Sequence, residues 1–142
     1  MTPFTKLRRV SDYLRHLKTD GHTHHFVTDQ AHVVKKLATS SGIVVAKARP
    51  ELSTDGSLGS YDINTVIFVL HPDLGAGRTD NREEELYDDM MEVATGIISQ
   101  LRENIDSGCT ALSGISLGSV SLVPSASVFG GWFGWVIDIT LE

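Results

Sequence analysis

The spacing of hydrophobic residues in the first forty positions predicts two helices. From Phe4 to Lys18 an apolar side chain recurs every three or four residues, as it does on one face of a helix. A second, shorter helix is expected from about Asp29 to Ala38, with Thr28 or Asp29 as its capping residue. The histidine-rich segment Gly21–His25 between them is expected to form a polar turn. The apolar positions of the first helix are Phe4, Leu7, Val10, Leu14 and Leu17.

Two β-branched, apolar segments follow and predict a β-hairpin. Ile43–Ala48 has the composition of a strand, and Pro50 is expected to end it because proline cannot donate to a central ladder. Tyr61–Leu70 carries the strongest strand signal in the chain. Glu51–Ser60 is rich in Gly, Ser and Asp, which predicts a long turn between the two strands.

The second half of the chain predicts a long helix and then two more strands. The helix runs from Thr79 or Asp80 to about Asn104, and its acidic start suits the positive end of a helix dipole. A strand is expected over roughly 115–123, with Pro124 as its end. The last strand covers about 131–141, where apolar residues alternate with Asp138 and Thr140, a pattern typical of a sheet with one face in water.

These elements predict one α+β domain over residues 1–142. Their order is α-α-β-β-α-β-β. Two hairpins separated by a helix favour a four-stranded, mainly antiparallel sheet with the helices packed on one face.

Composition and charge exclude several classes of function. The chain has 41% hydrophobic and 21% charged residues, which is ordinary for a folded domain, and its net charge of −6 gives no basic footprint for direct, sequence-specific binding of nucleic acid. The single cysteine, Cys109, excludes an internal disulfide. No segment approaches the roughly 20 apolar residues of a membrane helix, and no apolar stretch follows the charges of residues 1–9 as in a signal peptide. The expected location is the cytoplasm, or a particle assembled there.

Four histidines form the clearest candidate for a metal site: His22, His24, His25 and His32. Histidine is a common metal ligand, and alternate residues of an extended segment point to the same side, so His22 and His24 could share an ion. A zinc site needs a third or fourth ligand. The two interpretations are a small metal-dependent enzyme and, in preference, a polar turn with no metal.

Three other motifs resemble a catalytic or phosphate-binding sequence but lack the further residues or the secondary structure that such a site needs. The acids Glu83, Glu84 and Glu85 are expected to face water at a helix start. Gly75–Arg78 lacks the lysine and the Ser or Thr of a phosphate-binding loop. Ser116 lies in a G-x-S-x-G string, but that motif requires a strand before it and a helix after it, whereas a loop and a strand are expected here. The sequence therefore predicts no catalytic residue and no cofactor.

Aromatic residues among glycines precede the last strand, at Phe129, Trp132 and Phe133. One interpretation is that they seal the hydrophobic core while the glycines turn the chain. The other is that they project as an interface for a partner. Alternation along a strand cannot bury all of them on one face, so both interpretations stay open.

The order of elements, with the acidic-start helix Asp80–Asn104 and the terminal Gly134–Ile139 stretch, resembles small virion proteins of tailed bacteriophages. The likeness is to tail-terminator and tail-completion proteins and spans residues 26–142; the N-terminal helix and the histidine segment have no counterpart in it. The resemblance implies a non-enzymatic subunit of a phage tail or of a phage-derived contractile injection system. It would form a ring, hexameric by expectation, that caps the tail tube and contacts the neck proteins.

A ring requires two different patches on each subunit. The candidates are Phe129, Trp132 and Phe133, and the pairing of Arg8 and Arg9 on the first helix with Glu83 and Glu84 at the start of the long helix. The alternative functions are an intracellular binding or regulatory module that dimerises and the small metal-dependent enzyme built on the histidines.

Overall fold

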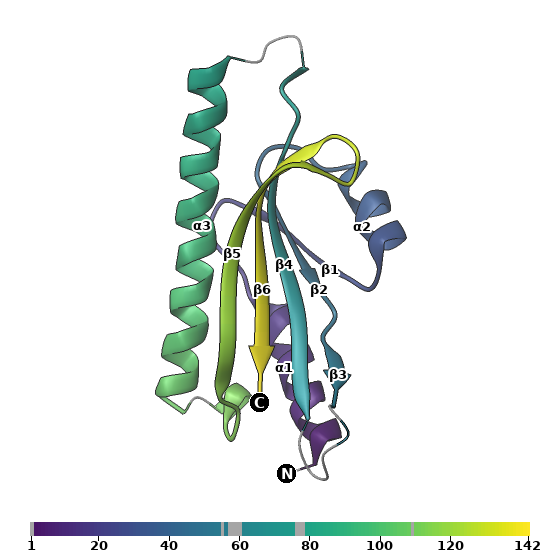
Figure 1. Ribbon diagram of the computed structural model, residues 1–142, viewed down its shortest axis with the longest axis vertical. Coiled ribbons are helices and arrows are strands. Elements are labelled where there is room, and N and C mark those ends of the chain that lie inside the picture. Colours follow the sequence, from purple (N-terminus) through teal and green to yellow (C-terminus); the bar gives the residue numbers. More distant parts are fainter. Residues whose placement is uncertain (1, 55, 57–60, 76–78, 109) are drawn as a thin grey trace.

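A mixed β-sheet is the framework of the molecule (Figure 1). The computed structural model describes residues 2–54, 56, 61–75, 79–108 and 110–142. In these residues the sheet has six strands in the order β1-β2-β4-β6-β5, with the short β3 paired to β4. The strands are β1 (Thr23–Val27), β2 (Val44–Ala48), β3 (Glu51–Ser53), β4 (Asp62–Pro72), β5 (Leu117–Val128) and β6 (Trp132–Leu141).

The centre of the sheet follows the sequence patterns closely. β4 and β6 pair antiparallel from Ile63↔Leu141 to Pro72↔Trp132, and β2 pairs antiparallel with β4, which confirms the predicted hairpin. Ile137, Ile139 and Leu141 are buried, whereas Asp138 is exposed, as the alternation in the last strand predicts.

The prediction of four mainly antiparallel strands is wrong in two places. The histidine-rich segment expected to be a turn contains β1, which runs parallel to β2, and the expected turn after Pro50 contains β3. A parallel neighbour requires a crossover connection, and here the helix α2 (Gln30–Leu37) supplies it. The sheet is therefore mixed.

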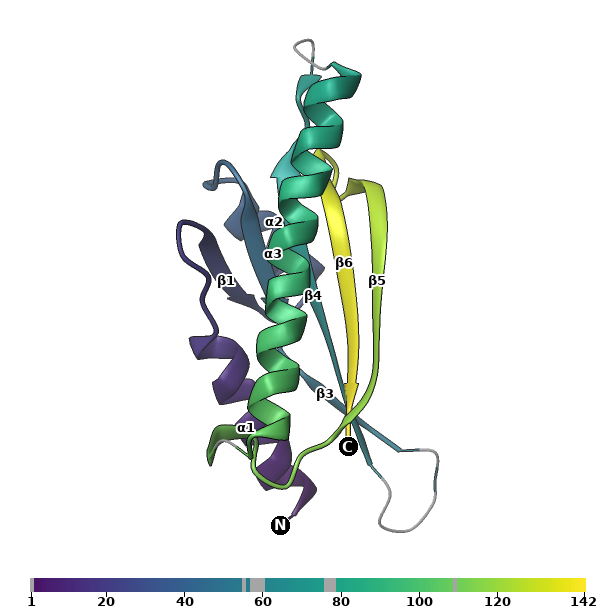
Figure 2. The ribbon, with the colours of Figure 1, turned by 90° about the vertical axis from the view of Figure 1, so that its left-hand side faces the viewer.

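Two longer helices cover one face of the sheet. α1 (Pro3–His16) is capped by the Thr2 side chain, and α3 (Asp80–Asp106) by that of Thr79. Their buried residues, such as Val10, Leu14 and Met90, join a large hydrophobic core with Ile67 and Ile137 of the sheet. A short 3₁₀ helix, η2 (Thr110–Leu112), adds the buried Leu112 to this core. Figure 2 shows α3 running in front of the strands, with α1 at the lower left beside the lower end of α3.

The short helix α2 packs on the other face of the sheet. Its Val33 and Leu37 form a second, smaller cluster with Val44, Ala46 and Leu70, which alternate along β2 and β4 with the residues of the main core. Val27, Phe68, Val128, Phe129 and Trp132 complete the cluster.

Pro124 does not end a strand, contrary to the sequence prediction. β5 continues through it to Val128, although its register shifts between Ser125 and Val128. β5 lies at the end of the sheet order, and a proline without an N–H donor is tolerated on an edge strand, where one row of backbone groups faces away from the sheet.

Candidate functional site

The four histidines do not converge on one point. His24 and His25 are neighbours on β1, so their side chains lie on opposite faces of the sheet. In the described part of the chain, no group of three His, Cys, Asp or Glu side chains is placed to hold a metal ion.

Each of the four histidines has a ring nitrogen occupied by hydrogen bonding; in His22 it is Nδ1, 3.1 Å from the Thr19 hydroxyl oxygen. The Thr19 N–H donates to Nε2 of His24 over 3.0 Å, and Nε2 of His25 lies 2.7 Å from the Ser40 hydroxyl oxygen. Nδ1 of His32 accepts from the Thr28 N–H at 3.1 Å. These contacts fix the connections around β1 and α2, a local structural role that is sufficient to account for the histidines.

A buried lysine lies next to this region and was not singled out by the sequence. Lys47 of β2 is only 1% exposed, and its Nζ donates to the carbonyl oxygen of Leu17 at 2.6 Å, at the C-cap of α1. Burial, and then the charge of Lys18, lowers the pKa of Lys47 to about 8. The sequence could have indicated it through its position within an apolar strand. Such a strand is buried, and a buried cation requires a polar partner.

His24 shares the α1 side of the sheet with Lys47. Burial, followed by the charge of Lys47, lowers the pKa of His24 to about 4. Because Nε2 accepts a hydrogen bond from the Thr19 N–H, the neutral ring carries its own proton on Nδ1, which is buried without a hydrogen-bond partner among the described residues. Burial, and then Lys36, also lowers the pKa of His25.

The structure around Ser116 does not have the arrangement that its motif needs for catalysis, and most of Gly75–Arg78 lies outside the described residues. Ser116 exchanges two backbone hydrogen bonds with Glu142 and leads directly into β5, so the helix that a nucleophile elbow needs does not follow it. Within 75–78 only Gly75 lies among the described residues, and its N–H donates to a carboxylate oxygen of Asp73.

The aromatic candidates divide between the two hydrophobic clusters. Phe133 is 6% exposed and packs in the main core, with its ring centroid 5.2 Å from that of Tyr87, so it is not a surface residue for a partner. Phe129 and Trp132 are half-buried against the second cluster, where Phe129 meets Phe68 edge to face at 5.0 Å. Phe129 also has a positive φ of 51°, which places it in the turn between β5 and β6. The core interpretation accounts for these three side chains.

The charged candidates lie at opposite ends of the long axis (Figure 1). Arg8 and Arg9 belong to α1, near the end marked N, and Glu83 and Glu84 belong to the first turns of α3 at the other end. Arg8 and Glu84 are exposed. Arg9 is half-buried, and one of its guanidinium nitrogens donates to the Ser113 carbonyl oxygen at 3.4 Å.

A groove lies beside the basic residues of α1. It is lined by one face of that helix and by Arg49 and Pro50 after β2, and its volume is about 460 Å³. The lining residues are Phe4, Thr5, Leu7, Arg8, Ser11, Arg49 and Pro50. Of these, only Arg8 was predicted as an interface residue; Phe4, which is 80% exposed, and Arg49 were not.

The fold and its surface define an α+β protein with a six-stranded mixed sheet and a groove flanked by arginines. No protein-family model matches the chain, and no curated protein matches it in sequence. In the described residues, none of the helices has the length and apolar character to cross a membrane.

Proposed function

We propose that the protein is a structural subunit of a phage or phage-like tail, which assembles with copies of itself into a ring at the end of the tail tube. The observation that carries the proposal is the separation of opposite charges. The helix α1, which carries Arg8, lies at one end of an elongated subunit, and the start of α3, which carries Glu84, lies at the other (Figure 1). Such a subunit has the two different, complementary patches that a head-to-tail contact requires.

The sheet and its helices support this role by making the subunit rigid. β4 and β6 are paired over ten consecutive residue pairs, and α3 runs along them through 27 residues, about 40 Å of helix. The ends of the subunit are thereby held apart at a fixed distance, which is the property a ring needs in order to close with a defined number of copies.

The proposal is tested on the purified chain and on its genetic surroundings. Sedimentation velocity over a wide concentration range, with electron microscopy of the heaviest species, is expected to give closed rings, either of the chain alone or after addition of the tail-tube protein encoded beside it. A chain that stays a monomer in both situations, with no tube, sheath or capsid gene in its neighbourhood, contradicts the proposed role.

A second candidate function, a binding module that dimerises, is favoured by one observation. The edge strand β5 is 12 residues long and has no charged residue, and Figure 2 shows no element beyond it. Proteins usually protect such an edge with charges, because its free backbone groups otherwise pair with another strand. Pro124 and the register shifts near Leu117 and Ser125 protect only the ends of β5.

Antiparallel pairing of two β5 strands about Ser121 would place Val120 of one copy opposite Leu122 of the other. In a variant with Cys109→Ser, the exposed Ser121→Cys is then expected to form a disulfide-linked dimer under mild oxidation, since facing strand residues are within disulfide reach. Ser119→Cys is the matched control and would not face itself. Equal crosslinking of both variants contradicts this second candidate.

A further inference from the structure

The groove beside α1 combines apolar and cationic surface. Leu7 and the buried Pro50 form its apolar part, while Phe4, Arg8 and Arg49 are exposed around it. Arg49 is held in place because its guanidinium group stacks on the Phe26 ring, 4.8 Å from the centroid, and its Nε reaches the Thr28 hydroxyl at 3.5 Å. No carboxylate lines the groove among the described residues. The groove therefore fits a partner surface with both acidic and apolar side chains.

The first turns of α3 carry such a surface. Glu84, Asp88 and Met91 are spaced i, i+4 and i+7, so they share one helix face, and this face is turned away from the buried Leu86, Met90 and Ile97. All three are exposed, and Met91, at 39%, is one of the few large apolar side chains left in water. Figures 1 and 2 both show the start of α3 extending past the adjacent ends of β5 and β6.

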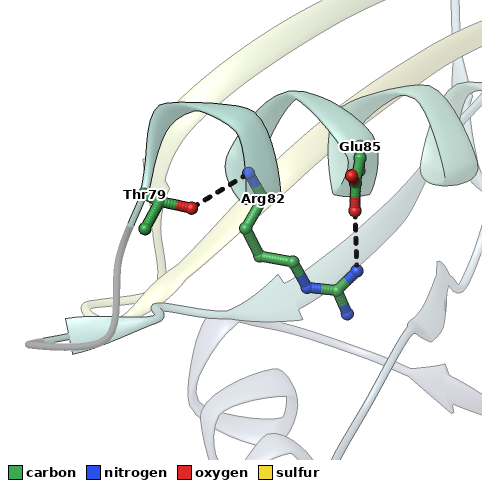
Figure 3. A network of polar contacts seen from close by, with 3 residues as sticks. All are labelled: Thr79, Arg82 and Glu85. Atoms are coloured by element: carbon green, nitrogen blue, oxygen red, sulfur yellow. Dashed lines mark hydrogen bonds and ion pairs between the residues drawn. The ribbon is translucent and has the colours of Figure 1, made fainter.

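The carboxylates of this helix face are available for a partner. Glu85, which points in another direction, is held by Arg82 at 3.2 Å, next to the Thr79 cap of the helix (Figure 3). Glu84 and Asp88 have no ion pair with any residue that the structure describes. Their charges are therefore not neutralised by any residue in the described part of the chain.

The groove and the acidic helix face of one subunit cannot meet. Asn104, near the end of α3, donates a hydrogen bond of 2.8 Å to the Tyr13 hydroxyl, which fixes α1 beside the C-terminal end of α3. Glu84 lies 20 residues before Asn104 in the same helix, about 30 Å away along its axis. Contact between the two surfaces requires a second copy of the chain.

We propose that the groove lined by Phe4, Arg8 and Arg49 is the docking site for the Glu84–Asp88–Met91 face of α3 from a second copy of this chain. Arg8 and Arg49 pair with the two carboxylates, and Phe4 covers Met91, whose sulfur packs well against an aromatic ring. The contact uses two different patches and is therefore heterologous, so it continues from copy to copy until a ring or a filament results. The inference rests on the proposed self-assembly and names the surfaces that mediate it.

Charge reversal tests the contact. Arg8→Glu alone and Glu84→Arg alone are each expected to weaken self-association by about 10- to 100-fold, because like charges then face each other. An equimolar mixture of the two variants is expected to restore assembly, since each variant retains one native end and the two altered ends complement each other. The double variant, with both changes in one chain, is also expected to assemble. Sedimentation velocity measures all four samples.

Matched controls separate this contact from net charge and from folding. Lys35→Glu and Glu103→Arg make the same changes in charge at exposed positions outside both surfaces and are expected to leave assembly unchanged. Thermal unfolding should be the same for all variants in dilute solution. Assembly that neither Arg8→Glu nor Glu84→Arg weakens overturns the docking site and leaves self-assembly standing. A wild-type chain that stays monomeric at every concentration, both alone and with the tail-tube protein, overturns both. Weakening without rescue in the mixture overturns the specific pairing.

Discussion

The two faces of the sheet are covered to very different extents. On one face α1 and α3 bury a continuous core that includes Ile67, Val69 and Ile137. On the other face α2 covers only the cluster around Val44 and Leu70. Beyond α2 the second face carries partly buried or exposed valines and polar residues on β4, β5 and β6, among them Asn64, Val66, Ser121, Val123, Val136, Asp138 and Thr140.

This difference indicates a division of roles between the faces. Burial of apolar surface stabilises the fold mainly on the α1 and α3 side, at roughly 25 cal/mol per Å². The open part of the second face contributes little to that core, so its side chains are freer to vary without loss of folding. Substitutions on the two faces should therefore differ in their effect on stability, and the predictions below test this from the largest effect to the smallest.

The largest effect is expected at the central contact of the sheet, with Gly134→Ala. A Cβ on Gly134 would meet the backbone carbonyl oxygen of Val69 and approach Sδ of Met90 to 3.0 Å, and φ is +153°. The Val69 carbonyl cannot move without breaking the β4–β6 ladder, so we expect a loss of about 4 kcal/mol or more in unfolding free energy, or failure to fold. Urea unfolding followed by circular dichroism measures it.

Gly96 provides the matched glycine control. It lies in α3, and a Cβ there would meet no atom within 4 Å. Gly96→Ala is therefore expected to stabilise the protein by up to about 1 kcal/mol, because alanine is the better helix former. If both alanine variants lose stability to the same degree, the close approach at Gly134 is not the cause.

Truncation of buried side chains compares the faces directly. Ile137→Ala removes a fully buried side chain of the sheet beneath α3, and Leu37→Ala removes a buried side chain of α2 itself, which packs in the second cluster. Both are expected to destabilise by about 2–5 kcal/mol, with the larger loss at Ile137, because the smaller cluster under α2 can collapse into the space left behind. Val34→Ala, exposed on α2, is the control and should change little. A larger loss at Leu37 than at Ile137 would contradict the ranking of the faces.

The sequence predicted the elements whose patterns arise from one-sided or complete burial. Tyr61–Leu70 and residues 131–141 gave β4 and β6 nearly to their ends, because their apolar side chains are needed in the main core. β1 was missed because His24 and His25 place polar rings on both faces, where they are held by Thr19 and Ser40. No periodicity reveals such a strand; its hydrogen-bond partners lie in segments that only the fold brings near.

The candidate site was predicted in part for a similar reason. Arg8 and Glu84 were recognisable from local charge, since each lies on a helix with a clear apolar stripe. Arg49 was not, because it reaches the groove only through the pairing of β2 with its neighbours and its stacking on Phe26. Phe4 read as part of the apolar stripe of its helix, and only its exposure in the structure distinguishes it from a core residue.

Lys47 is a buried charged residue on the otherwise apolar, well-packed face of the sheet, and its titration provides a smaller test. Its pKa is about 8 in the folded protein and 10.5 in an unfolded chain. Between these values the unfolded state binds more protons, so stability should rise as the pH rises from 8 towards 10.5, by about 2–3 kcal/mol. Below pH 8 Lys47 is charged in both states and its contribution no longer changes with pH.

Lys47→Met is expected to remove this rise, because methionine does not titrate. Urea unfolding of both proteins at pH 7.5 and pH 10 measures the difference, and contributions from other titrating groups cancel in the comparison. Parallel changes in the two proteins would mean that burial does not lower the pKa of Lys47.

The smallest effect is expected on the open part of the second face, at Val123 of β5. Its side chain is 50% exposed, so Val123→Thr should change the unfolding free energy by less than about 0.5 kcal/mol in dilute solution. The same measurement at high protein concentration distinguishes an open surface from one that another copy covers. A loss that appears only in concentrated protein would mean that self-association buries Val123, in which case the edge β5, and not the groove beside α1, is the contact between copies.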